Sequence, residues 1–169
     1  MPGNHPVKDI EALLETGYLL QPAKDLPPVI VQGEPGAGKS TLLFSLYRRQ
    51  TIYLRALQTG WIPVFVYAHE LSTRLVAGDT SLKQFLIAYA RHASDALGER
   101  AYDSLANLIA NSYEHLQFLI IIDGLDEITN RRFYKQMADA INKLIDADRN
   151  ERARSGRLNR YVFSCRTDE

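Results

Sequence analysis

The sequence contains a single cysteine, Cys165, among its 169 residues. An internal disulfide framework is therefore excluded, and such low cysteine usage is typical of proteins kept in a reducing compartment. The N-terminal segment, MPGNHPVKDI, lacks the basic and apolar blocks of a signal peptide. No apolar run approaches the length of a membrane span. These absences predict a soluble, cytoplasmic protein without a membrane partner.

The sequence also lacks an excess of either charge, since Lys and Arg together number 20 and Asp and Glu together number 20. A formal net charge of zero gives no overall attraction to nucleic acid or to anionic membranes. The content of 46% hydrophobic and 24% charged residues is that of an ordinary globular protein. The length suits one domain with a substantial core.

Short apolar or β-branched runs alternate with segments of helical periodicity along the chain. The expected strands are 29–32, 62–68, 118–122 and 160–165. The expected helices are 5–16, 39–53, one that opens at Ser81, 100–113 and 130–147, and residues 1–26 are assigned to an N-terminal helix and linker. Strands that alternate with helices form crossover units, so the predicted fold class is α/β, a three-layer sandwich with a mainly parallel sheet.

The segment GEPGAGKST, residues 33–41, lies between an expected strand and an expected helix. Its glycines reach backbone angles that are closed to other residues, so successive N–H groups can turn towards one anion. The start of the helix adds its positive dipole end and its unpaired N–H groups. This context indicates the phosphate-binding loop of a nucleoside triphosphatase. Lys39 would contact the β- and γ-phosphates, the Ser40 hydroxyl would bind Mg²⁺, and Thr41 would lie near the α-phosphate.

A second motif, FLIIIDGLDE at residues 118–127, ends an apolar strand in an acidic turn. The strand places Asp123 at the carboxyl edge of the sheet, where ligands gather in open α/β folds. Asp123 is therefore the expected Walker B aspartate, which holds Mg²⁺ through water. Asp126 and Glu127 follow closely enough to orient or deprotonate an attacking water, and the sequence leaves open which of them does so.

A third motif, YVFSCRTDE, covers residues 161–169. Its strand ends at Ser164 and Cys165, and Arg166 follows just past the edge of the sheet. An arginine beside a γ-phosphate stabilises the negative charge that spreads in the transition state of phosphoryl transfer. We expect that role for Arg166, the alternative being an ordinary surface arginine. Cys165 is expected to be a packed strand residue.

Five arginines lie in the segment RNERARSGRLNR, residues 149–160, with Glu151 as its only acidic residue. A nucleic-acid patch would be expected to carry aromatic residues for base stacking, and the run has none. We expect instead a solvated loop or a surface that faces another domain. The histidines at 69, 92 and 115 share no metal-ligand spacing, so no zinc site is assigned.

These motifs, together with IPVFVYAHEL at 62–71, occur in an order that resembles the NACHT family. This family comprises P-loop nucleoside triphosphatases of the signal-transduction (STAND) class, with bacterial members. The most specific point of the resemblance is DGLDE, because the family places a small residue directly after the Mg²⁺ aspartate and acidic residues two positions further along. SCR resembles the sensor 1 segment of the bacterial members. The resemblance covers roughly residues 27–168.

The resemblance implies that nucleotide phosphates are bound by Gly33, Glu34, Pro35, Gly36, Ala37, Gly38, Lys39, Ser40 and Thr41. It implies Mg²⁺ at Ser40 and Asp123, support of hydrolysis by Lys39, Asp126 and Glu127, and a γ-phosphate sensor at Arg166. The implied activity is slow, Mg²⁺-dependent hydrolysis of ATP, or of GTP. The implied protein is a switch that self-associates in its triphosphate state and acts in signal transduction or innate immunity.

The chain departs from the family pattern because it stops at Glu169, before the strand that follows sensor 1 in the family's sheet order of 5-1-4-3-2. We therefore expect a nucleotide-binding domain over 27–169 that is incomplete at its C-terminus. Two other classes stay open. One is a DNA-acting AAA+ ATPase, such as a loader or a transposition helper, which the neutral net charge and DGLDE disfavour. The other is a fragment that binds nucleotide or a partner protein without hydrolysis.

Overall fold

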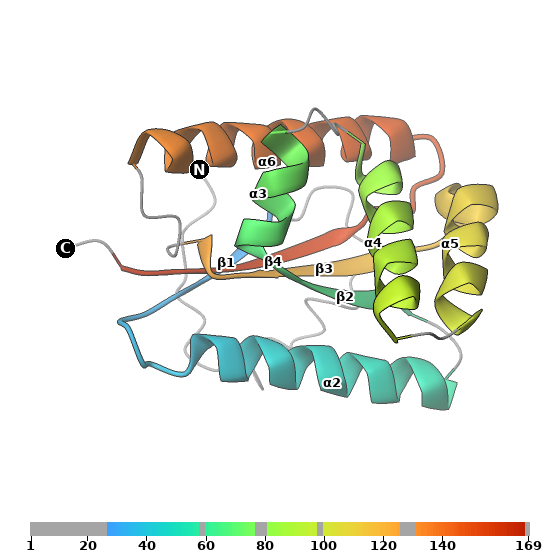
Figure 1. The fold of residues 1–169 in the computed structure, drawn as a ribbon, viewed down its shortest axis with the longest axis horizontal. Helices are drawn as coiled ribbons and strands as arrows, with labels where there is room; N and C mark the ends of the chain where they lie inside the picture. Colours follow the sequence, from blue (N-terminus) through green and yellow to red (C-terminus); the bar gives the residue numbers. More distant parts are fainter. Residues whose placement is uncertain (1–26, 58–59, 77–80, 98–99, 126–130, 168–169) are drawn as a thin grey trace.

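The computed structural model describes residues 27–57, 60–76, 81–97, 100–125 and 131–167 (Figure 1). In chain order the elements are β1 (Val29–Gln32), α2 (Lys39–Leu57), β2 (Ile62–Tyr67), α3 (Ala68–Val76), α4 (Leu82–Leu97), α5 (Arg100–Ser112), the 3-10 turn η1 (Tyr113–His115), β3 (Phe118–Asp123), α6 (Arg131–Arg152) and β4 (Arg160–Cys165). The helix expected at 5–16 lies outside the described residues. None of the described helices is both long enough and apolar enough to cross a membrane.

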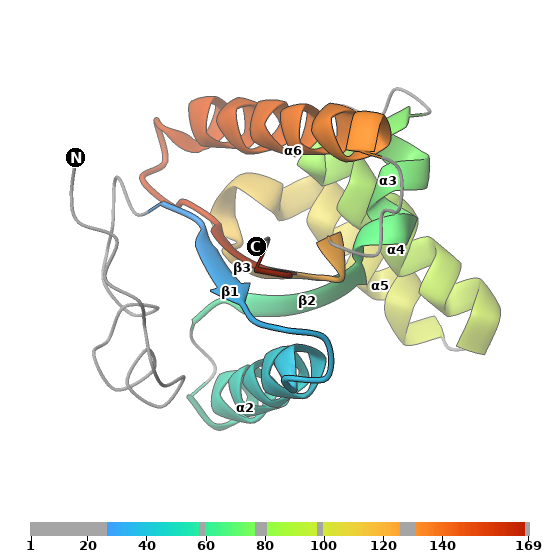
Figure 2. The same cartoon turned by 90° about the vertical axis from the view of Figure 1, so that its left-hand side faces the viewer.

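The strands form one parallel sheet in the order β1-β4-β3-β2. Helix α2 covers one face, whereas α3 and α6 lie on the other face (Figures 1 and 2). Helices α4 and α5 pack side by side and extend that second helical layer. The predicted α/β class is therefore confirmed, and within the described residues the sheet is parallel throughout.

Burial along the strands follows their place in the sheet. The inner strands β3 and β4 are buried at every position, whereas the outer strands β1 and β2 are only partly buried. A parallel strand that is covered on both faces has no polar side, which explains the continuous apolar run FLIII. Successive residues of β3 enter different cores, because side chains alternate between the faces of a sheet.

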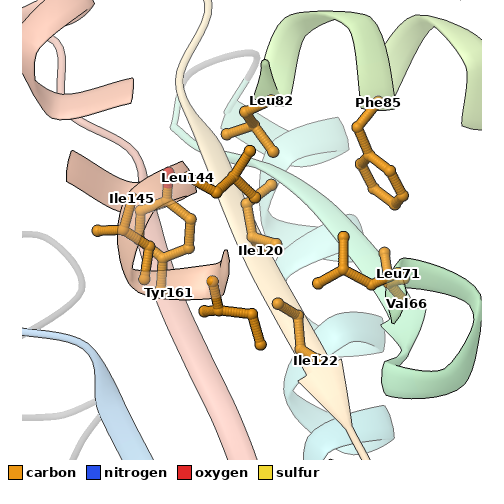
Figure 3. A pocket seen from close by; sticks show the side chains of 10 residues that line it. Val66, Leu71, Leu82, Phe85, Ile120, Ile122, Leu144, Ile145 and Tyr161 are labelled. Carbon is orange, nitrogen blue, oxygen red and sulfur yellow. The ribbon is translucent and has the colours of Figure 1, made fainter. Parts of the chain in front are cut away.

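Two hydrophobic cores hold the helices against the sheet. The smaller core lies between the sheet and α2 and includes Leu43 and Leu46, which are 0% and 1% exposed. The larger core lies on the α6 face and draws side chains from α3, α4, α5 and α6. It contains an apolar cavity of about 10 Å³, near the lower limit for one water molecule (Figure 3). Because hydrocarbon lines it, this cavity is a small packing gap and offers no ligand a polar contact.

Several elements differ from the expectation, among them α2, which continues to Leu57 beyond the expected end at 53. Helix α3 is not predicted, and the second strand ends at Tyr67 because Ala68 already begins this helix. The strand passes into the helix without an intervening turn residue, so the sequence carries no Gly or Pro to mark the boundary. Helix α6 continues to Arg152, beyond the expected end at 147.

Asp148 and Arg152 explain why α6 continues. They form a buried ion pair with an Nε to Oδ1 distance of 3.1 Å, and the side chain of Arg152 is 0% exposed. The guanidinium also donates to the carbonyl oxygens of Tyr113 (2.8 Å), Leu116 (2.6 Å) and Arg157 (3.0 Å). Arg152 therefore ties the end of α6 to η1 and to the segment that leads into β3.

The Asp148 carboxylate is the centre of a wider polar network. It accepts hydrogen bonds from the hydroxyls of Tyr113 and Tyr161, both at 2.6 Å, and from the Asn159 amide at 3.0 Å. Burial, followed by the charge of Asp148, raises the pKa of both phenols. The side-chain Oδ1 of Asn159 accepts a hydrogen bond from the Phe118 N–H at 2.8 Å. The network therefore joins α6, η1, β3 and β4 at the amino edge of the sheet.

The prediction that residues 149–160 form a solvated loop is therefore wrong for two of the five arginines in this segment. Arg152 is fully buried, and Arg160 belongs to β4 with an exposed fraction of 6%. The guanidinium carbon of Arg160 lies 5.5 Å from the centre of the Trp61 ring. Arg154 and Arg157 are exposed, as expected. Runs of charge are usually solvated, but a planar guanidinium can be buried where acceptors surround it.

Candidate nucleotide-binding site

The segment between β1 and α2 turns through glycines for two different reasons. Gly36 and Gly38 have φ angles of 78° and 81°, in the left-handed region that residues with a Cβ rarely adopt. Gly33 is limited by space, because a Cβ there would lie 3.3 Å from the Cβ of Ala37. The N–H of Ala37 donates to the carbonyl of Glu34 at 3.1 Å and closes a turn inside the loop. The backbone is thus held in a tight curve ahead of α2.

Lys39 begins α2 and folds back over this loop. Its ammonium donates to the carbonyl oxygens of Gly33 (2.8 Å) and Glu34 (3.0 Å). An ammonium has three donors, so these two bonds do not exhaust it. Ser40 and Thr41 follow in the first turn of the helix and are exposed. The unpaired N–H groups and the positive dipole end of α2 therefore lie beside a lysine and two hydroxyls.

Asp123 is the last residue of β3 and is 4% exposed. The hydroxyl of Ser164, in β4, donates to Oδ1 of Asp123. The same hydroxyl accepts a hydrogen bond of 2.9 Å from the N–H of Gly124. Gly124 has a φ of 80°, which turns the chain sharply after the carboxylate. Ser164 therefore contacts both sides of the turn at the end of β3.

Asp123 and Ser164 point to the face of the sheet that α2 covers. The residues two positions earlier in each strand, Ile121 and Val162, belong to the core on the α2 side, and side chains alternate along a strand. Val31, close to the end of β1, packs against the same core. The buried carboxylate therefore lies on the α2 face at the carboxyl edge of the sheet. The loop that leads from β1 into α2 lies on the same side of the sheet (Figure 2).

Of the remaining expected site residues, Arg166 is among the described residues, whereas Asp126 and Glu127 are not. Arg166 directly follows β4 and is exposed at this carboxyl edge. The expectation gave Ser164 no role beyond ending its strand. Finding its contact with Asp123, 41 positions away in the chain, requires the pairing of β3 with β4, which no local pattern provides.

Gly33, followed after four residues by Gly38, Lys39 and Ser40, has the spacing of the P-loop NTPase class, and it lies between a strand and a helix at the carboxyl edge of a parallel sheet. A family model described as the NACHT domain matches residues 27–154. This match covers most of the chain, which therefore belongs to the NACHT family, in the STAND class of P-loop NTPases. Membership implies nucleotide binding and hydrolysis by this domain. No curated protein and no solved structure gives a significant match.

Proposed function

We propose that this domain is an Mg²⁺-dependent switch that binds ATP and hydrolyses it slowly, with GTP as the second candidate nucleotide. The observation that carries the proposal is the preformed loop before α2 on the same face and edge of the sheet as the buried Asp123 carboxylate. Phosphate needs convergent N–H groups and positive charge, and its metal ion needs a fixed carboxylate nearby. Family membership supports the same chemistry.

In this proposal residues 33–41 form the phosphate cradle. The loop N–H groups and the first turn of α2 donate to phosphate oxygens. Lys39 exchanges its bonds to the carbonyls of Gly33 and Glu34 for bonds to the β- and γ-phosphates. Thr41 lies near the α-phosphate. Because Lys39 already spans the loop, binding needs a side-chain rearrangement more than a change of the backbone.

The residues present fit Mg²⁺. Mg²⁺ prefers oxygen ligands, keeps several waters and is usually held by one or two protein groups together with substrate phosphates. Asp123 and Ser40 supply such a carboxylate and a hydroxyl, and within the described ranges no cluster of three or more His, Cys, Asp or Glu residues offers a full metal cage. When bound, Mg²⁺ neutralises charge on the β- and γ-phosphate oxygens.

Hydrolysis transfers the γ-phosphoryl group to water, and the protein contributes positioning and charge stabilisation. We assign Asp126 and Glu127 to the attacking water. Lys39 and Arg166 would stabilise the charge that spreads over the γ-phosphate oxygens. As in the family, the triphosphate state would favour self-association, and the switch would serve cytoplasmic signalling or defence.

The DNA-acting alternative loses part of its support. It depends on the arginines of 149–160 as a surface for the nucleic-acid backbone. Arg152 and Arg160 are buried, and the guanidinium of Arg152 is occupied by Asp148 and by backbone carbonyls. Turnover stimulated by added DNA would restore this alternative.

The first test is nucleotide content and affinity. The purified chain is denatured, any released nucleotide is identified, and ATP, ADP, GTP and GDP are titrated with Mg²⁺ into the emptied protein. Lys39→Ala should abolish saturable binding, whereas Lys143→Ala, an exposed lysine in α6, serves as the matched control. Equal binding by the Lys39 variant and the unsubstituted chain, or no binding by either, would contradict the proposal.

A second measurement separates hydrolysis from binding alone. Alanine at both Asp126 and Glu127 should reduce release of inorganic phosphate while nucleotide affinity is retained. Each single substitution would then show which carboxylate acts on the water. Unchanged hydrolysis in the double variant would exclude these two residues from the reaction.

A further inference from the structure

We propose that Ser164 is a positioning residue for Asp123, and that its hydroxyl holds this carboxylate in the orientation that receives the Mg²⁺–nucleotide. The inference rests on the proposed function and adds Ser164 to the residues that serve the nucleotide site. It stands on the two hydrogen bonds of a single hydroxyl, to the Asp123 carboxylate and from the Gly124 N–H.

The bonding capacity of the hydroxyl defines its task. A serine hydroxyl has one hydrogen to donate and two lone pairs that accept. The hydrogen goes to Asp123, and one lone pair accepts from Gly124. Ser164 therefore cannot donate to a phosphate oxygen without releasing the carboxylate. Its direct partner in this site is the aspartate, and any effect on the nucleotide passes through that group.

The carboxylate keeps enough capacity for a metal ion. An ionised carboxylate has two oxygens with about four acceptor positions, and the bond to Ser164 uses one of them. That bond, together with the turn at Gly124, limits rotation of the carboxylate about its side chain. Partners that orient a metal ligand in this way are a regular part of metal sites.

The position of Ser164 in the sheet adds a second argument. β4 lies between β1 and β3, and Ser164 is paired with Val31 in β1, two residues before the loop glycine Gly33. Its side chain reaches the end of β3 on the other side. Ser164 is 1% exposed, so bulk water does not compete for these bonds. One buried hydroxyl therefore fixes the carboxylate at a set position relative to the strand that carries the phosphate loop.

The test compares Ser164→Ala and Ser164→Thr with the unsubstituted chain. Nucleotide affinity is measured in EDTA, and Mn²⁺ affinity of the protein–nucleotide complex is measured by electron paramagnetic resonance. Loss of an orienting partner typically weakens metal affinity about 10- to 100-fold, so Ser164→Ala should weaken Mn²⁺ binding by that factor. Its affinity for nucleotide in EDTA should stay unchanged. Ser164→Thr keeps the hydroxyl and should restore most of the Mn²⁺ affinity.

Ser72→Ala is the matched control, because Ser72 is also buried but donates to the His69 carbonyl within α3. It should leave Mn²⁺ affinity unchanged. Circular dichroism reports whether each variant is folded. If Ser164→Ala does not fold, Ser164→Cys, whose thiol is a weak donor of similar size, takes its place with the same expected loss.

The outcomes are separable. Mn²⁺ affinity that is equal in Ser164→Ala and the unsubstituted chain would overturn the positioning role and leave the proposed function intact. Loss of nucleotide affinity in EDTA without rescue by threonine would also overturn it, because the residue would then act on the fold. If the unsubstituted chain binds no nucleotide in either condition, the proposed function fails and this inference fails with it.

Discussion

Replacing Arg152 with methionine is expected to remove a large part of the stability of this domain. The substitution keeps an unbranched side chain but deletes a guanidinium that is 0% exposed. It leaves the Asp148 carboxylate buried without its cationic partner, and it removes a donor from the carbonyls of Tyr113 and Leu116. The stacking of the guanidinium on the Tyr113 ring, 4.0 Å from its centre, is also lost.

The magnitude follows from the burial of the pair. Removing one partner of a buried ion pair typically costs about 3–5 kcal/mol, because the other charge stays buried and uncompensated. Globular domains have a total free energy of unfolding of about 5–15 kcal/mol. The midpoint of thermal unfolding should fall by about 6–20 °C, at about 2–4 °C per kcal/mol for a protein of this size.

Urea unfolding followed by circular dichroism is the assay, with Arg154→Met as the matched control. Arg154 is exposed in the same segment, and surface substitutions usually change stability by less than about 0.5 kcal/mol. A double variant that also carries Asp148→Leu should be less destabilised than the sum of the two single variants, by about 0.5–3 kcal/mol. A loss below about 1 kcal/mol for Arg152→Met, well under the range for a buried pair, would refute the reasoning, and so would an equal loss for Arg154→Met.

Two further predictions concern ionisation and backbone conformation. The pKa values of Tyr113 and Tyr161 are raised above the usual value of 10.0 by burial and then by Asp148. The contribution of these two shifts to the free energy of unfolding is therefore fully present below about pH 10. Above that pH the free energy of unfolding falls by up to about 2.7 kcal/mol per pH unit, because both tyrosines lose their protons first in the unfolded state. Urea unfolding between pH 9 and 11 should show this slope, and Tyr161→Phe should halve it; a pH-independent stability would contradict it. Gly38→Ala, at a φ of 81°, should cost about 1–2 kcal/mol and weaken ATP binding, and an unchanged thermal midpoint would show that the loop relaxes.

Much of this fold can be predicted because its motifs and its apolar runs are local. The loop at 33–41 lies in one continuous stretch between a strand and a helix, and its glycines have the special conformations or close contacts that the motif predicts. β3 is identifiable because a strand covered on both faces is mostly apolar, as the run FLIII at 118–122 is. The position of Asp123 follows from the end of that strand.

The remaining features depend on pairs that are distant in the chain. Arg152 is buried because it meets Tyr113 and Leu116, which lie 39 and 36 positions earlier. The rule that charged runs are solvated holds only when no such acceptors are near. Ser164 and Asp123 meet through strand pairing, 41 positions apart. A sequence pattern gives the chemistry of each of these residues, but it does not give the neighbour that determines what each residue does.

The amino and carboxyl edges of the sheet are connected through the register of β3 with β4. At the amino edge the Asn159 side chain accepts from the Phe118 N–H, immediately before the first paired residues, Leu119 and Arg160. At the carboxyl edge, one residue past the paired residues Ile122 and Phe163, the Ser164 hydroxyl donates to Asp123. A slip of one residue would turn every side chain of β4 to the opposite face, which would take Ser164 away from the carboxylate. The Asn159 side chain, which Asp148 holds, therefore favours at the far end of the sheet the same register on which the Asp123 contact depends.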